Sequence, residues 1–203
     1  MKSFLVGLIA GVSMALAASS AMAVPSATYD DTPDYATLSG YSTSTAGGTF
    51  NAGVDIYTTS SNGIILSPFP SPAYDGTGYY AAGPATQTLP NPAILTFSSL
   101  MSSFSFLWGS PDEYNTITFF NGLNPVTTLA SLLPGFNYTQ SGAVFVTVTG
   151  LLFDSVQFYS GSQAVEFASI SAVPVPAGLP LLGAGVALLG YLGMRRKRNA
   201  ATA

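Results

Sequence analysis

The amino-acid sequence predicts an all-β protein, an antiparallel β-sandwich or jelly roll flanked by an N-terminal signal peptide and a C-terminal transmembrane helix. In the middle of the chain, aromatic and β-branched residues alternate with polar ones over short segments, which is typical of half-buried antiparallel strands. Turn-forming Gly, Pro, Asn and Asp residues separate these segments. An uncharged apolar run lies near each end of the chain. Roughly seven to nine short strands in about 150 residues fit a sandwich or jelly roll.

Residues 1–23 are typical of a secretory signal peptide. Lys2 supplies the positive start, and a mostly apolar stretch follows over residues 4–18. Ala21 and Ala23 fit the small-x-small cleavage pattern, so we expect the mature chain to begin directly after Ala23. The alternative is an uncleaved N-terminal anchor.

Residues 24–172 are the predicted β domain. Residues 24–48 are polar and rich in Ser, Thr and Gly, which favours an edge strand beside a flexible loop. The following alternating segments predict strands at residues 54–57, 103–108, 115–120, 143–149, 156–158 and 165–170. In the last of these, Ile170 has the opposite parity to Val165 and Phe167.

Two other segments of this domain differ from the alternating pattern. Residues 67–92 contain six prolines, and proline cannot donate a hydrogen bond to a sheet. We therefore expect a long ordered loop or a wrap around an edge there, and not a central strand. Residues 123–133 are the one place in the domain where the pattern allows a helical turn.

The C-terminal stretch, residues 173–198, combines three features in order. Two prolines at alternate positions force an extended, non-helical backbone. An uncharged run at residues 177–194 is long enough for a short membrane-spanning helix, and the basic cluster after it predicts a cytoplasmic C-terminus, with residues 199–203 as the cytoplasmic end. The alternative is a buried core helix with a basic end. The proline motif consists of Val173, Pro174, Val175, Pro176 and Ala177, and the basic cluster of Arg195, Arg196, Lys197 and Arg198.

Together these features resemble a PEP-CTERM sorting signal, the tail that exosortase enzymes read. The family's Pro-Glu-Pro is Pro174-Val175-Pro176 in this chain, so the resemblance leaves open which exosortase acts on it. The resemblance implies cleavage near these prolines. The domain would then be released from, or attached to, the surface of a Gram-negative bacterium.

A second resemblance lies within the β domain. Residues 106–122, which include Trp-Gly-Ser-Pro-Asp-Glu-Tyr-Asn, are similar to a segment of a group of exosortase-dependent surface proteins with a small β domain. Many such domains end in a Phe-Glu-x-Asp-Asn-like strand. Residues 165–170 occupy that place here, but Ala168 and Ser169 replace the Asp-Asn pair. This resemblance implies an architecture and no particular activity.

Charged residues are scarce, and the basic and the acidic ones lie in separate parts of the chain. They make up only 7 % of the residues, against roughly 25 % in an average soluble domain. Residues 24–173 contain nine acids and no Lys, Arg or His, which argues against nucleic-acid binding. The chain lacks Cys and His altogether, which excludes disulfides, thiolate or histidine metal sites, and catalysis by either residue.

Asp112 and Glu113 are adjacent acids in a predicted turn between two strands. They allow a calcium site in which Ser110, Asn115 or backbone carbonyls add oxygen ligands. The alternative is a solvated turn in which Asp112 caps the loop backbone, and the lack of calcium-loop spacing favours this turn. No other cofactor is predicted.

Trp108 is the only Trp in the chain. It has the same parity as Phe104 and Phe106, which favours a position in the core over a role as a sugar-stacking platform. A carbohydrate-binding domain would instead use exposed tyrosines. The tyrosines expected in that role are Tyr74, Tyr79 and Tyr80.

These patterns predict an exported, non-enzymatic surface or extracellular-matrix protein. Its expected partners are an exosortase-type processing enzyme, the inner membrane for a limited time, and extracellular polysaccharide or biofilm, without nucleic acid. Two other functions stay open. One is a carbohydrate-binding jelly-roll module, and the other is a glycoside-acting enzyme, which would need two opposed carboxylates among the nine acids.

Overall fold

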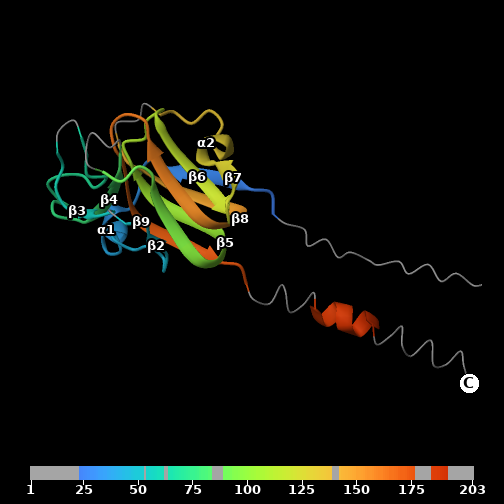
Figure 1. Cartoon of the computed structure of the whole chain (residues 1–203). Coiled ribbons are helices and arrows are strands. Elements are labelled where there is room, and N and C mark those ends of the chain that lie inside the picture. Colours follow the sequence, from blue (N-terminus) through green and yellow to red (C-terminus); the bar gives the residue numbers. More distant parts are fainter. Residues whose placement is uncertain are drawn as a thin grey trace, which may run out of the picture. The chain divides into compact units, whose positions relative to one another are not determined.

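The computed structural model describes residues 23–52, 54–61, 64–83, 89–138, 142–176 and 184–191. All but the last of these ranges belong to one compact unit, Ala23–Ala177, which contains the β domain (Figure 1). Residues 184–191 are helical and belong to a second unit. Among the described residues, no helix is long and apolar enough to cross a membrane. The parts of the predicted signal peptide and span that lie outside the described residues are 1–22, 177–183 and 192–194, and the basic cluster lies outside them as well.

The described part of the β domain forms nine strands and two short helices. In chain order these are β1 (Ser26–Asp30), α1 (Tyr35–Ser39), β2 (Thr49–Phe50), β3 (Ile56–Tyr57), β4 (Tyr79–Ala82), β5 (Ala93–Gly109), β6 (Asn115–Asn121), β7 (Asn124–Thr128), α2 (Leu129–Leu132), β8 (Val144–Ser160) and β9 (Val165–Pro174). All pairings between these strands are antiparallel. The all-β prediction is therefore confirmed.

Two 17-residue strands, β5 and β8, pair with each other along their length and curve through the whole domain (Figure 1). Their register shifts near the middle of β5, and such bulges bend a strand pair. Before the bend, residues 93–96 and 155–160 lie between β2 on one side and β6 and β7 on the other. After it, residues 103–109 and 144–149 lie between β9, β4 and β3 on one side and β1 on the other. We call these two parts the first and the second half-sheet.

The inner faces of the two half-sheets pack together and form the core. Phe158 of the first half-sheet stacks on Phe167 of the second, with ring centroids 3.9 Å apart and an interplanar angle of 7°. Phe119 of the first likewise meets Phe104 of the second at 5.8 Å. Such face-to-face contacts make the domain sandwich-like, as predicted. The residues predicted to face inward that are buried here are Phe104, Phe106, Trp108, Ile117, Phe119, Val144, Val146, Val148, Val156 and Phe158.

The second half-sheet is covered on its outer face as well. Leu38 of α1, together with Phe69 and Tyr79, packs against Leu107 and Ala168, which point away from the main core. The loop between β3 and β4 contributes Phe69 and Tyr74 to this cover. A side chain on the outer face of β9 is therefore buried, although the strand alternation alone would place it in solvent.

α1 differs from the sequence prediction, which placed only loop around a strand at residues 24–48. Five residues are too few to show a helical period, so the pattern carried no signal for it. A local cap stabilises the turn instead, because the Asp34 carboxylate accepts hydrogen bonds from the Thr37 N–H at 3.3 Å and from the Thr37 hydroxyl at 2.6 Å. The helical turn allowed at residues 123–133 is confirmed by α2.

The prediction that residues 67–92 contain no central strand is wrong for β4. This strand lies between β3 and β9, and its four residues are buried. The prolines flank β4 without interrupting it. The expected exposure of two tyrosines is wrong for the same reason, since Tyr79 and Tyr80 are 0 % and 6 % exposed and donate hydrogen bonds to the carbonyls of Thr59 and Thr43.

β9 confirms the predicted change of parity. Leu107 of β5 pairs with Ala168, and Ser105 pairs with Ser171, so β9 carries one extra residue between these pairs. Ser169 lies in this bulge with a φ of 52°. Its hydroxyl donates to the Leu38 carbonyl at 2.8 Å, which joins the bulge to α1.

Candidate functional site

Trp108 lies in the core and not on a surface. It is 2 % exposed, and its ring stacks on Phe136 at a centroid distance of 5.7 Å. The core prediction for this residue is therefore confirmed. The strand continues only to Gly109, where the chain turns toward the two acids that the sequence analysis selected.

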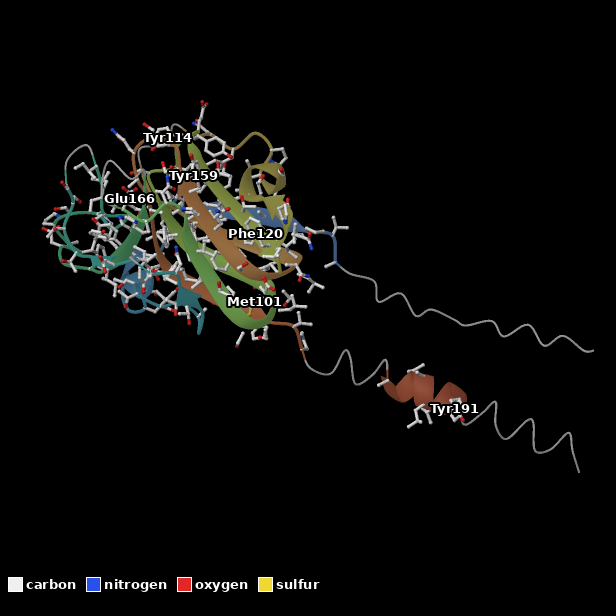
Figure 2. All side chains as sticks on the ribbon, viewed as in Figure 1. Met101, Tyr114, Phe120, Tyr159, Glu166 and Tyr191 are labelled. Carbon is white, nitrogen blue, oxygen red and sulfur yellow. The ribbon has the colours of Figure 1, made fainter. Side chains whose placement is uncertain are left out.

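The acid that shares a pocket with Asp112 is Glu166, and not Glu113, with which the sequence analysis paired it. Asp112 and Glu166 line the same small pocket of about 150 Å³, together with Ser110, Gln163 and the short apolar segment at residues 64–66. Glu113 is exposed and does not line this pocket. We call this space the acidic pocket. Figure 2 shows Glu166 and Tyr114 at the end of the domain opposite to Met101.

The register of the sheet places Glu166 in this pocket. Glu166 pairs with Gly109 of β5 on one side and with Ala81 of β4 on the other. A Cβ atom at Gly109 would lie 2.9 Å from the Pro68 Cβ and 3.1 Å from the Glu166 Cβ. Glycine at this position therefore lets the loop that contains Pro68 lie directly over the strands and enclose the glutamate.

Glu166 is 3 % exposed, and its two carboxylate oxygens differ in their surroundings. Oε1 accepts a hydrogen bond from the Leu66 N–H at 2.8 Å. Oε2 is buried and has no hydrogen-bond partner among the described residues. Burial raises the pKa of Glu166 to about 8, the Leu66 N–H opposes this increase, and the charge of Asp112 adds to it.

Asp112 is held by its neighbour in the turn. The Tyr114 hydroxyl donates to Asp112 Oδ2 at 2.6 Å, and the Asn115 N–H donates to the Asp112 carbonyl at 3.0 Å. Burial and this hydrogen bond raise the pKa of Tyr114. The Asn115 side chain was predicted as a further oxygen ligand, but it does not line the acidic pocket, and its polar atoms are buried with no hydrogen-bond partner among the described residues.

A second, larger pocket of about 610 Å³ adjoins the acidic pocket and shares Leu66 and Ser110 with it. We call it the hydroxyl-rich pocket, because Ser and Thr side chains dominate its polar lining. Those polar residues are Tyr35, Thr58, Thr59, Ser60, Ser67, Ser71, Asp75 and Ser110. Sequence analysis missed this pocket, although the clustering of Ser and Thr before and after residues 64–66 was a visible signal.

The donor set of the two pockets consists of oxygen. Within the described ranges, no group of three or more Asp, Glu, His or Cys side chains is placed to hold a metal ion. The acidic pocket contributes two carboxylates, a hydroxyl and an amide side chain. Such a set can bind a hard cation or donate and accept hydrogen bonds.

The described residues of the proline motif lie at the end of β9. Pro174 is the last residue of this strand, and the Val175 N–H donates to the Leu100 carbonyl at 3.0 Å. Val173 is 51 % exposed, and Pro176 is exposed as well. Ala23, at the predicted signal-peptide cleavage site, is exposed at the start of the described chain. Ala21, Ala177 and the basic cluster lie outside the described residues.

Comparison with protein-family models, with curated proteins and with solved structures finds no match for this chain.

Proposed function

We propose that the chain is an exported, non-enzymatic surface or extracellular-matrix protein of a Gram-negative bacterium. Its C-terminal tail holds it in the inner membrane for a limited time, with the basic cluster in the cytoplasm. An exosortase-type enzyme then processes the tail near the proline motif. The processed domain associates with extracellular polysaccharide.

The observation that carries this proposal is the position of the proline motif in the fold. The motif begins at the exposed end of β9, and the compact unit ends at Ala177. Val173 and Pro174 are exposed and extended, and a processing enzyme binds an extended peptide more readily than a helix. Cleavage directly after Pro174 would remove the tail and keep β9 whole, with the loss of only the hydrogen bond from the Val175 N–H to the Leu100 carbonyl.

Composition supports a role without catalysis. Residues 24–173 lack Lys, Arg, His and Cys, so only carboxylates, hydroxyls and amides remain for chemistry in the domain. The acids at the surface keep the domain negatively charged, which favours solubility outside the cell. The positive charges near both ends of the chain, Lys2 and the basic cluster, each predict that the domain between them is extracytoplasmic.

Intact mass spectrometry of the protein purified from its own cells tests the proposal. We expect a chain that begins at Val24 and ends within residues 173–177. The double variant Pro174→Ala, Pro176→Ala should keep its tail and stay in the inner-membrane fraction. Pro125→Ala, a change at an exposed position of β7, is the matched control and should be processed normally. Wild-type protein that keeps its whole tail in the inner membrane would rule out the proposed processing.

The hydroxyl-rich pocket favours a second candidate function, carbohydrate binding by the same domain. Its volume of about 610 Å³ accommodates a small sugar, and its Ser, Thr, Tyr35 and Asp75 side chains supply both donors and acceptors. Binding of the full chain to the organism's exopolysaccharide should weaken in Asp75→Asn. It should not weaken in Asp31→Asn, an exposed acid outside the pocket. Equal binding by both variants would remove this candidate.

A further inference from the structure

The acidic pocket contains a carboxylate oxygen that has no hydrogen-bond partner in the part of the chain that the structure describes. Glu166 is 3 % exposed and lines the pocket, and its Oε2 has no hydrogen-bond partner among the described residues. A buried, unpaired carboxylate oxygen is costly unless a positive charge or a hydrogen-bond donor reaches it. The Leu66 N–H is already used by Oε1.

No side chain of this domain can supply the positive charge. Residues 24–173 contain no Lys, Arg or His, so neither an ammonium, a guanidinium nor an imidazolium group is available within the domain. Asp112 lines the same pocket and adds a second carboxylate, and its Oδ2 is held by Tyr114. The pocket therefore brings two carboxyl groups together, and the domain has no cationic side chain to pair with them.

Two further polar residues of the lining can bind a hard divalent cation. Ser110 and Gln163 add neutral oxygen atoms, while Ile64, Ile65, Leu66 and Ala164 form the apolar part of the wall. Calcium takes six to eight oxygen ligands and tolerates irregular geometry, whereas zinc and copper prefer imidazole and thiolate ligands, and residues 24–173 contain no His or Cys. A volume of about 150 Å³ holds an ion with several waters, each of which takes roughly 30 Å³.

We propose that Glu166 and Asp112 together bind one calcium ion in the acidic pocket, with oxygen atoms of Ser110 and Gln163 and with water completing its coordination. This site differs from the Asp112–Glu113 pair that the sequence suggested, because Glu113 does not line the pocket. The ion joins three segments, namely β9, the turn after β5 and the loop that covers them. Calcium binding at this site requires neither processing of the tail nor carbohydrate binding.

Calorimetric titration of the full chain with CaCl₂ tests this site. The protein is purified in a mild non-ionic detergent and freed of metal with EDTA, which is then removed. We expect one calcium ion per chain for the wild type and weaker binding of MgCl₂, which demands a stricter octahedral geometry. Glu166→Gln and Asp112→Asn should each weaken calcium binding by at least about tenfold.

Glu113→Gln is the matched control, since it removes one negative charge from the same turn without touching the pocket. It should change the affinity by less than about twofold, because exposed charges are screened. The absence of calcium binding by the wild type would overturn the proposal. The proposal would also be overturned if Glu166→Gln and Asp112→Asn bound calcium as tightly as the wild type. Circular dichroism checks that each variant is folded, and if Glu166→Gln does not fold, Asp112→Asn decides the outcome.

Discussion

Replacing Glu166 with Gln should abolish a pH dependence of stability that the wild-type protein shows when divalent cations are chelated. The pKa of Glu166 is about 8 in the folded protein and 4.5 without the surrounding structure. Between these values the folded state holds a proton that the unfolded state has released. The stabilisation by the protonated carboxyl is therefore complete below about pH 4.5 and is lost as the pH rises toward 8.

The size of the effect follows from the two pKa values. A difference of one pKa unit corresponds to about 1.4 kcal/mol, so the burial of Glu166 implies a loss of roughly 3–5 kcal/mol across this range. Gln is neutral at every pH and keeps an oxygen that can accept the Leu66 N–H. The variant should match the wild type near pH 5 and exceed its stability near pH 8.5 by a few kcal/mol.

Urea unfolding of the full chain in detergent and EDTA measures this difference. The fluorescence of Trp108 reports on the β domain, because it is the only Trp and lies in the core. Glu113→Gln provides the control, since this side chain is exposed and should leave the pH profile of the wild type unchanged. Parallel pH profiles for the wild type and Glu166→Gln would show that Glu166 is not buried in a protonated form.

Three further changes test the packing, each by urea unfolding at pH 5. Phe158→Ala removes the ring that stacks on Phe167 at 3.9 Å and should cost about 3–5 kcal/mol, and a cost below about 1 kcal/mol would contradict the sandwich core. Gly109→Ala should cost about 1–3 kcal/mol because its Cβ would lie 2.9 Å from the covering loop, whereas Gly142→Ala, which has open space around it, should be tolerated. Equal stability of the two glycine variants would mean that the loop is not packed on β5. Tyr79→Phe loses the 2.8 Å hydrogen bond to a backbone carbonyl and should cost about 0.5–1.5 kcal/mol, and no loss at all would place this hydroxyl in water.

The strands could be predicted where a local pattern decides which face is buried. Phe104, Phe106 and Trp108 alternate with smaller or polar residues. This alternation places the three large side chains on one face of the strand, where they pack against the opposite half-sheet. Even the change of parity near Ile170 was visible, since a bulge must break the alternation in the sequence. These features depend on neighbours within a few positions of the chain.

β4 and the acidic pocket could not be predicted, because they depend on contacts between distant segments. In the local sequence Tyr79 and Tyr80 look like loop residues, but β4 pairs with β9, which buries Tyr80 in the main core and Tyr79 under the cover of the outer face. Glu166 likewise has the parity of a solvent-facing residue, and only the cover over the outer face of β9 buries it. The strand order that brings Glu166 toward the turn of Asp112 has no signature in the local pattern.

Composition and fold together limit how this domain can neutralise its buried acid. A domain with Lys or Arg could pair Glu166 internally, but residues 24–173 offer neither. The neutralising charge must then come from the medium, either as a proton or as a cation. A proton and a calcium ion would both bind the Glu166 carboxylate. Low pH and calcium should therefore each stabilise the loop at residues 64–66 that covers it. The stability of this part of the fold should therefore depend on the pH and the calcium concentration of the solution around the domain.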